Sequence, residues 1–344
     1  MISCYLPSGS KIGVGYQAHA LANAMTERGH SVTVFSACEA SEGSLYRTET
    51  LPMTGSNRTF KFALQLRKVD WSSFDVLHAH GDDYWLWRRR VKCHLRTLHG
   101  SCFREALTIR GARGRLRMTL LGFSELLASA VADRTVAVSE SSRQWMPWVK
   151  TVIPNGIDLD RFRPRERTTF PSILFVGTYG RRKRGSLVAD AFERDVLPVL
   201  PDCELWMVCE DAPPLPRVRS MGRISDDELS DLYGRAWVFC LPSTYEGFGI
   251  PYIEAMASGC PVVATENPGA MEVTSKGQLG LIVDDDLLGE ALLKLLSSPE
   301  QRARLASAGL VAARGYEIHS VCSRYEEIYR DLMASSRRTV AREL

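Results

Sequence analysis

Two glutamates in the second half of the chain stand in a setting that suits a ligand with hydroxyl groups and a diphosphate. Glu246 ends a loop after a strand pattern, and Glu254 lies eight residues later, about two helical turns, which places both carboxylates near one face. Between them, the segment from Gly247 to Ile250, which includes Phe248 and Gly249, is expected to start a helix. Free backbone amides and the positive end of the helix dipole attract phosphate there, while carboxylates accept hydrogen bonds from hydroxyls.

Two histidines close strand patterns in the first half, His80 in L-H-A-H-G and His99 in T-L-H-G. Taken alone, a histidine at the end of a strand is more often structural than catalytic. His78, His80, Asp82 and Asp83 leave a metal cluster open as an alternative, although two acids in a loop are usually solvated. The triplets 158–160 and 284–286 satisfy D-x-D formally, without the surroundings that a metal motif needs.

Short β-rich runs alternate with helical stretches in both halves, a rhythm typical of parallel sheets covered on both faces. Because ligands of such sheets bind beyond the carboxyl ends of the strands, each loop after a strand is a candidate site. Strands are expected at 2–6, 31–36, 75–80, 93–99 and 134–139, then at 172–177, 203–209, 237–242 and 261–265. Helices are expected at 14–28, 186–196 and 226–233, after Glu246, and at 287–296, 301–313 and 316–333.

The composition is that of an ordinary globular protein, with 344 residues, 45% hydrophobic and 24% charged, and the length suits two domains. Nine scattered cysteines without a C-x-x-C pair argue against a disulfide framework and against a zinc site. The start of the sequence does not read as a signal peptide, and the most apolar stretch, 118–132, is too short and too polar to span a bilayer. We therefore expect a cytoplasmic protein.

Recognisable sequence motifs occur around the two glutamates and in three other segments of the chain. The stretch 245–265, Y-E-G-F-G-I-P-Y-I-E-A-M-A-S-G-C-P-V-V-A-T, resembles the retaining GT-B glycosyltransferases whose signature is two glutamates separated by seven residues, known as glycosyltransferase family 4 or glycosyl transferases group 1. Further matches are N-G-I-D at 155–158, V-G-T-Y-G-R-R-K-R-G at 176–185 and G-R-I-S-D-D-E-L at 222–229. The resemblance implies an α/β GT-B fold, two Rossmann-like doubly wound domains facing a central cleft.

The resemblance also implies domain bounds. Residues 1–160 would bind the acceptor and 161–315 the nucleotide sugar, while 316–344 would form a C-terminal helix that crosses back to the first domain.

The same resemblance assigns roles to individual residues. Glu246 would hold hydroxyls of the donor sugar, Glu254 the ribose hydroxyls, and Lys183 with Arg182 the diphosphate, where the leaving group gains charge. Thr178 occupies a position where the family often has arginine, which removes one expected phosphate ligand.

Several further positions complete the expected site. His99 would lie near the donor sugar as a catalytic residue beside Glu246 and Lys183, and Gly15, in a glycine-containing loop at 13–15, would approach the donor phosphate. The other residues expected to bind the donor are Arg223 and Ile224 at the base, and Phe248, Gly249 and Ile250 at the helix start.

The implied reaction is transfer of a sugar from a UDP- or GDP-linked donor to an acceptor hydroxyl. The anomeric configuration would be retained, no cofactor or metal would be needed, and closure of the two domains would exclude water. The acceptor would be a glycan, a lipid-linked molecule or a small molecule, and no nucleic acid is expected as a partner. A sugar-nucleotide epimerase or phosphorylase on the same fold is the alternative, and a sugar-nucleotide-binding module without turnover is a third hypothesis.

Charge is distributed unevenly, with 22 Lys and Arg against 14 Asp and Glu up to Pro164, a net +8, and 21 against 26 afterwards, a net −5. A basic, apolar-flanked segment at 103–127 lies in the positive half and suits peripheral contact with an anionic membrane. A partly buried helix after an arginine-rich loop, broken early by Gly111 and Gly114, is the alternative. The basic residues are Arg104, Arg110, Arg113, Arg115 and Arg117, and the apolar ones include Leu116, Met118, Leu120, Leu121, Phe123, Leu126 and Leu127.

Overall fold

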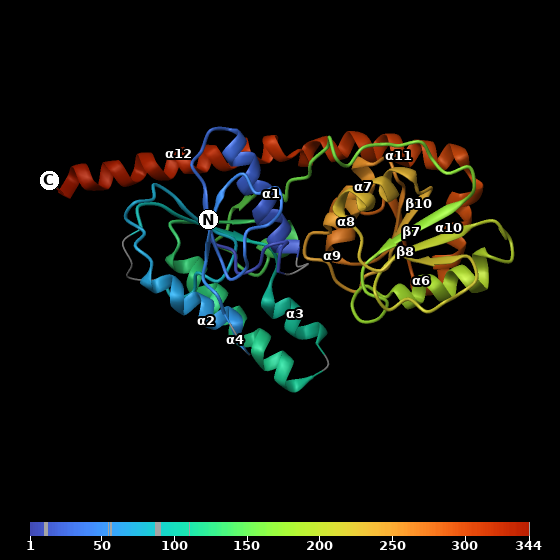
Figure 1. Ribbon diagram of the computed structural model, residues 1–344, viewed down its shortest axis with the longest axis horizontal. Helices are drawn as coiled ribbons and strands as arrows, with labels where there is room; N and C mark the ends of the chain where they lie inside the picture. The colour runs from blue at the N-terminus through green and yellow to red at the C-terminus, as the bar shows by residue number, and fades with distance from the viewer. Residues whose placement is uncertain (10–12, 54, 56, 87–90, 110, 344) are drawn as a thin grey trace. The chain divides into compact units, whose positions relative to one another are not determined.

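The computed structural model describes residues 1–9, 13–53, 55, 57–86, 91–109 and 111–343, which form two compact units (Figure 1). The first unit combines Met1–Gly156 with Ile318–Leu344, and the second is Ile157–Glu317. The division therefore comes at Gly156, four residues before the expected end of the first domain. Ile157 belongs to the second unit because its N–H donates to the Tyr316 carbonyl at 2.7 Å and it bridges Glu317 in parallel.

The first unit is built on parallel strands. In the segment expected as a strand at 2–6, only Ile2 makes bridges, to Phe35 on one side and Ala79 on the other. Ile2 thereby links the pair β1-β2 to the sheet of order β3-β4-β5-β6. The bounds are β1 Thr33–Ser36, β2 Arg47–Thr50, β3 Leu77–Ala79, β4 His94–Leu98, β5 Arg134–Ala137 and β6 Thr151–Val152.

Helices of the first unit come from both ends of the chain. The last helix, α12 (Ile318–Glu343), packs its apolar face on α1 (Gly13–Glu27), where Cys322 and Tyr325 share a buried cluster with Leu21 and Met25. The final segment of the chain is thus part of the first unit's core. The other helices of this unit are α2 Arg58–Gln65, followed by a 3-10 turn at Leu66–Lys68, α3 Cys102–Thr108, α4 Ala112–Val131 and α5 Glu140–Arg143.

One part of the first unit differs from the expected arginine-rich loop. Gly111 is the N-cap of α4, whereas Gly114 lies within its first turn, so the helix is not broken there. Arg113, Arg115 and Arg117 are therefore helical residues. Arg110 lies outside the described residues.

The second unit is a six-stranded parallel sheet of order β12-β11-β10-β7-β8-β9, covered by helices. Its strands are β7 Ser172–Val176, β8 Glu204–Val208, β9 Val218–Ser220, β10 Val238–Leu241, β11 Val262–Thr265 and β12 Gly280–Val283. Its helices are α6 Gly185–Ala191, continued by a π-helical turn at Phe192–Val196, α7 Asp226–Arg235, α8 Ile250–Ala257, α9 Pro268–Val273, α10 Leu288–Ser297 and α11 Pro299–Ala313, with 3-10 turns at Asp285–Leu287 and Arg314–Tyr316. These strands and helices confirm the doubly wound α/β pattern expected for this half.

All nine cysteines lie in the described residues and none forms a disulfide; eight of them are buried, as expected for thiols that pack as small apolar side chains. Among the helices that the structure describes, none is both long and apolar enough to cross a bilayer.

Candidate active site

The candidate site of the second unit lies at the point where the strand order reverses. β7 and β10 are neighbours in the sheet although β8 and β9 come between them in the chain. Loops after such a pair diverge to opposite faces and leave room for a ligand at the carboxyl edge. The loop after β7 carries Lys183, and the loop after β10 carries Glu246.

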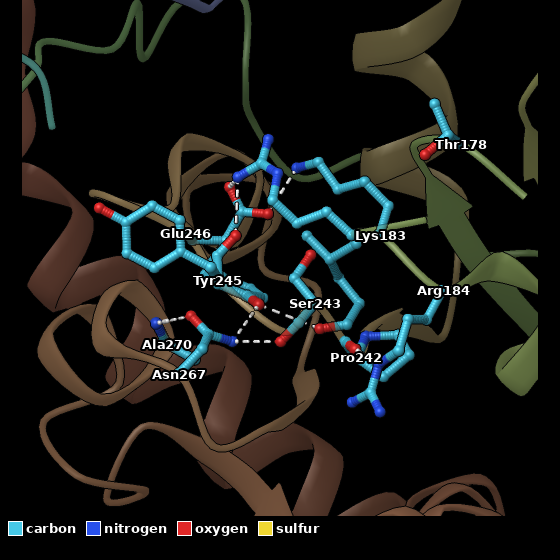
Figure 2. Close-up of polar contacts among 12 residues, drawn as sticks. Thr178, Lys183, Arg184, Pro242, Ser243, Tyr245, Glu246, Asn267 and Ala270 are labelled. Atoms are coloured by element: carbon cyan, nitrogen blue, oxygen red, sulfur yellow. Dashed lines mark hydrogen bonds and ion pairs between the residues drawn. The ribbon is translucent and has the colours of Figure 1, made fainter. Parts of the chain in front are cut away.

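Lys183 and Glu246 meet directly, with 2.8 Å between Nζ and Oε1 (Figure 2). Arg182 adds a second cation, 3.3 Å from Glu246 Oε2, and its Nη1 also donates to the Tyr245 carbonyl at 2.7 Å. Glu246 is buried, whereas the Arg182 side chain is 43% exposed. The sequence-predicted residues Arg182, Lys183 and Glu246 are thus brought together as a carboxylate held between two cations.

The charge state of Glu246 follows from these contacts. Burial alone would raise its pKa, but Lys183 and Arg182 act more strongly together, and the pKa is lowered. The carboxylate is therefore ionised at neutral pH and accepts hydrogen bonds without donating any.

Glu254 lies in α8 in a different environment. Burial raises the pKa of its carboxyl to about 7, and the Tyr233 hydroxyl, Lys183 and Arg161 lower it only in part. The two glutamates of the motif are thus distinct in charge near neutral pH, because Lys183 makes its ion pair with Glu246.

The start of α8 differs by three residues from the expected one. The helix begins at Ile250, and Gly249 is its N-cap with a φ of 94°, a left-handed conformation that favours glycine. Phe248 is buried and packs edge-on against Tyr316, with ring centroids 5.9 Å apart. The expected helix start at Gly247 is therefore wrong, since the left-handed turn at Gly249 stops helical geometry from extending backwards.

Thr178, at the position where the family often has arginine, lies apart from the ion pair (Figure 2). Thr178 Oγ1 donates to the Gly180 carbonyl at 3.0 Å, and in Figure 2 Thr178 stands well apart from Glu246. Arg184 is also turned elsewhere, with Nε donating to the Pro242 carbonyl at 2.6 Å and Nη1 paired with Asp285. Of the arginines at 181–184 with a described ion pair, Arg182 is the one that reaches Glu246.

The residues expected at the base lie before α7. Arg223 is exposed and pairs with Glu210, so its guanidinium is turned to a carboxylate. Ile224 lines a shallow hollow with Met221 and Leu232. The carboxylates of Asp227, Glu228 and Asp231 line the same hollow.

His99 belongs to the first unit and Glu246 to the second, so the surroundings of His99 are described within the first unit alone. Its Nε2 lies 2.9 Å from Nδ1 of His80, and both rings line a small hollow with Asn155. Burial and the nearby Arg96 lower the pKa of His99 to about 4, although a hydrogen bond with Asn155 acts against the shift. The imidazole is therefore neutral at pH 7. Sequence reasoning assigned no role to Asn155, which hydrogen-bonds His99. Its place in the N-G-I-D motif at 155–158 was the signal that could have identified it.

The possible metal cluster is not assembled. His78 contacts the Tyr329 hydroxyl at 2.7 Å, and Asp83 pairs with His94 at 2.9 Å and with Arg96. These partners hold the side chains within the protein. Across the described parts of the chain, no three His, Cys, Asp or Glu side chains are grouped as metal ligands.

Gly15 lies in the first turn of α1, so the expected loop at 13–15 is wrong. A Cβ at Gly15 would come within 2.7 Å of the Tyr5 carbonyl oxygen. Because Gly15 has no side chain, the first turn of α1 packs directly on the backbone at Tyr5, and the helix includes residues 13–15.

A network that the sequence did not reveal supports the loop of Glu246. The Asn267 amide donates to the Ser243 carbonyl and to the Tyr252 hydroxyl, both at 3.1 Å, while its oxygen accepts from the Ala270 N–H (Figure 2). Asn267 follows β11, the strand next to β10. It therefore fixes the path of the chain just before Glu246.

Comparison with known proteins agrees with this architecture. Residues 12–161 match the family described as Glycosyltransferase Family 4, and residues 156–310 match Glycosyl transferases group 1. A phosphatidyl-myo-inositol mannosyltransferase of Mycobacterium leprae is 28% identical, over 97% of each chain. A GDP-mannose:cellobiosyl-diphosphopolyprenol alpha-mannosyltransferase of Komagataeibacter xylinus is 26% identical, over 76% of this chain and 72% of its own.

Solved structures show the same fold. A sucrose-phosphate synthase of Thermosynechococcus elongatus superposes with a TM-score of 0.80 and 20% identity, over 97% of this chain and 98% of its own. Anabaena Alr3699/HepE, solved in complex with UDP-glucose, has a TM-score of 0.76 and 16% identity, over 96% and 98%. With both family matches, the glutamate motif and the two Rossmann-like units, the chain belongs to the GT-B glycosyltransferases of family 4, glycosyl transferases group 1.

Proposed function

We propose that this glycosyltransferase transfers a sugar from a nucleoside diphosphate sugar to a hydroxyl of a lipid-linked acceptor, with retention at the anomeric carbon. The observation that supports it most is the buried Glu246 carboxylate held between Lys183 and Arg182. Such a group can accept hydrogen bonds from sugar hydroxyls while its two cations face a diphosphate.

Each part of the site has a task in this proposal. Lys183 and Arg182 stabilise the charge that grows on the leaving diphosphate. Glu246 orients the sugar, and Glu254 accepts from the ribose hydroxyls when it is ionised. The departing phosphate takes the proton of the acceptor hydroxyl on the same face, so no side chain serves as nucleophile.

The first unit would supply the acceptor side. The neutral imidazole of His99 can accept a hydrogen bond from a sugar hydroxyl through one ring nitrogen and donate through the other. The relatives named above act on phosphatidyl-myo-inositol and on a diphosphopolyprenol, which supports a lipid-linked acceptor for this chain. Both are mannosyltransferases, so mannose is the first sugar to test and a GDP- or UDP-linked donor the first class.

The proposal is tested by thermal shift with GDP, UDP, ADP and dTDP, followed by transfer assays with the matching labelled sugar nucleotides and a bacterial lipid extract. We expect label in the lipid fraction and one nucleoside diphosphate released per sugar transferred. The anomeric configuration of the product, read by NMR, should equal that of the donor. A donor sugar that changes without acceptor would indicate an epimerase, and binding without release of nucleoside diphosphate would indicate a binding module.

A further inference from the structure

The histidines that follow two neighbouring strands of the first unit are in direct contact. His80 comes directly after β3 and His99 directly after β4, its parallel neighbour. Nδ1 of His80 lies 2.9 Å from Nε2 of His99, and the ring centroids are 5.2 Å apart. His80 is buried, with 6% of its surface exposed, whereas His99 is half-buried. His99 is therefore the more accessible of the two, and His80 can act on a ligand through it.

The ring of His80 is held in one place. It stacks on the ring of His78, with centroids 4.4 Å apart and 28° between the planes. The ring of His78 is fixed in turn, because the Tyr329 hydroxyl lies 2.7 Å from its Nδ1 and the Thr97 hydroxyl 2.7 Å from its Nε2. His80 therefore has little freedom to turn away from His99.

Both imidazoles of the pair are neutral at pH 7. Burial lowers the pKa of His80 well below 6.5, and burial with the nearby Arg96 lowers the pKa of His99 to about 4. A neutral imidazole has one N–H that donates and one bare nitrogen that accepts. In the contact between His80 Nδ1 and His99 Nε2, one ring must therefore donate and the other accept.

The direction of this hydrogen bond follows from the second nitrogen of His80. Nε2 of His80 is buried and has no hydrogen-bond partner among the residues that the structure describes. A proton there would leave a buried N–H unpaired, which is rarer in proteins and more costly than an unpaired acceptor. The proton of His80 is therefore on Nδ1, from which it donates to His99.

The proton of His99 is placed by the same contact. Because Nε2 of His99 accepts from His80, its own proton lies on Nδ1. The hydrogen bond with Asn155 agrees with this arrangement, since it raises the pKa of His99, as expected where the imidazole donates. The hydrogen bonds thus run in one direction, from His80 to His99 and from His99 to Asn155.

We propose that His80 is a positioning residue for the transfer reaction, which keeps the His99 proton on Nδ1 so that His99 offers an N–H to a hydroxyl oxygen of the donor sugar. Of the two roles open to a neutral imidazole, accepting is already taken by His80, and donating is left for the ligand. This rests on the proposed function, in which His99 contacts the sugar. An N–H that is oriented before the sugar arrives needs no rearrangement when it binds.

The test first locates the protons in the free chain. Histidine labelled with 15N is incorporated, and the 15N shifts at pH 7.5 separate protonated from bare ring nitrogens. His80→Leu removes the donor, whereas His80→Asn keeps a side-chain N–H as many bonds from Cα as Nδ1. His19→Leu is the matched control, because Nδ1 of His19 also has a close partner in the first unit, the Tyr46 hydroxyl at 2.8 Å.

We expect His99 to be protonated on Nδ1 and bare on Nε2 in the wild-type chain, in His80→Asn and in the control. In His80→Leu the proton should divide between the two nitrogens of His99, so their resonances should move toward each other. Turnover of GDP-mannose should fall about ten-fold in His80→Leu, with affinity for GDP changed by no more than about three-fold, as expected for a group that orients another. His80→Asn should recover most of the turnover, and His19→Leu should leave it unchanged.

Three results would overturn the inference. They are a wild-type His99 protonated on Nε2, His99 resonances that His80→Leu leaves unchanged, and equal turnover by His80→Leu and the wild-type chain. The proton positions are measured without substrate, so they do not depend on the identity of the sugar. The expected positions in a chain that transfers no sugar would leave the histidine pair standing while the proposed function fails.

Discussion

Lys183 Nζ lies 2.8 Å from Glu246 Oε1, and this contact joins the loops after two strands that are neighbours in the sheet but far apart in the chain. Each residue compensates the burial of the other, and Arg182 contributes a second positive charge to the same carboxylate. An arriving diphosphate would compete with Glu246 for both cations. In the proposed function, Glu246 would therefore orient the sugar and also hold the two phosphate ligands in place.

This competition predicts the effect of Glu246→Gln. The neutral amide keeps much of the shape but releases Lys183 and Arg182, so affinity for the nucleoside diphosphate should change by no more than about three-fold or should increase. Turnover should fall by about 10²-fold or more, the scale found when one oriented electrostatic group is removed from an active site. Calorimetry and steady-state kinetics measure the two effects separately.

Glu254→Gln should behave in the opposite way. If Glu254 accepts from ribose hydroxyls, the amide weakens nucleotide binding by about 10-fold, the cost of a hydrogen bond to a charged group, with a smaller effect on turnover of bound donor. Because the pKa of Glu254 is about 7, donor affinity in the wild-type chain should rise between pH 6 and pH 8 as the carboxyl ionises. Equal losses of affinity in both glutamine variants would contradict the assignment.

Activity should survive removal of divalent metal. The cations beside Glu246 are the side chains of Lys183 and Arg182, so the leaving phosphate can be stabilised without a metal ion. Transfer is measured after dialysis against EDTA, with a metal-dependent glycosyltransferase as the control. Complete loss of transfer that Mn²⁺ restores would show that a group of carboxylates binds metal during the reaction.

Much of this site could be predicted from the sequence, because its key residues lie in short motifs. Glu246 and Lys183 stand at fixed distances from glycines and strand patterns, so the resemblance located them before any contact was known. The hydrogen bonds that hold the loop of Glu246 in place could not be predicted. Asn267 is tied to Ser243 and Tyr252, and such contacts between separate loops leave no trace in local periodicity.

The fold, too, could be predicted from the sequence only in part. Periodicity located the buried strands β7, β8, β10 and β11, since each is mainly an apolar run, but it gave no indication of β2, β6, β9 or β12. β2 reads Arg-Thr-Glu-Thr and has no buried residue, so its pairing with β1 decides its structure. At Gly114 the local preference against helix was outweighed by the packing of the rest of α4 on the first unit.

Gly15→Ala should destabilise the first unit. The added methyl group would lie 2.7 Å from the carbonyl oxygen of Tyr5, and a backbone atom cannot move aside as a flexible side chain can. We expect a loss of about 1–3 kcal/mol in the free energy of unfolding, typical of overpacking. Gly111→Ala is the matched control, because no described atom outside its chain neighbours lies within 4 Å of its added Cβ. Urea denaturation compares the two, and equal midpoints would show that α1 shifts freely.

The last prediction concerns the stability of the first unit at acidic pH. Burial lowers the pKa values of His94 and His99 to about 4, and those of His78 and His80 well below 6.5. In the unfolded chain these groups take up protons near pH 6.5, whereas the folded unit resists protonation down to about pH 4. The unfolded state therefore binds more protons between these values, and the stability of the first unit should fall as the pH drops from 6.5 to 4.

Each such histidine contributes at most about 1.4 kcal/mol for each pH unit within that window. His94→Gln should therefore make the free energy of unfolding less dependent on pH, because glutamine can still donate to Asp83 but takes up no proton. His319→Gln, at a half-exposed position of α12, is the matched control for the change of residue type. Proteolysis at a series of urea concentrations, with cuts in residues 1–156 assigned by mass spectrometry, reports on the first unit alone. A pH dependence that His94→Gln leaves unchanged would mean that this imidazole is protonated in the folded chain as readily as in the unfolded one.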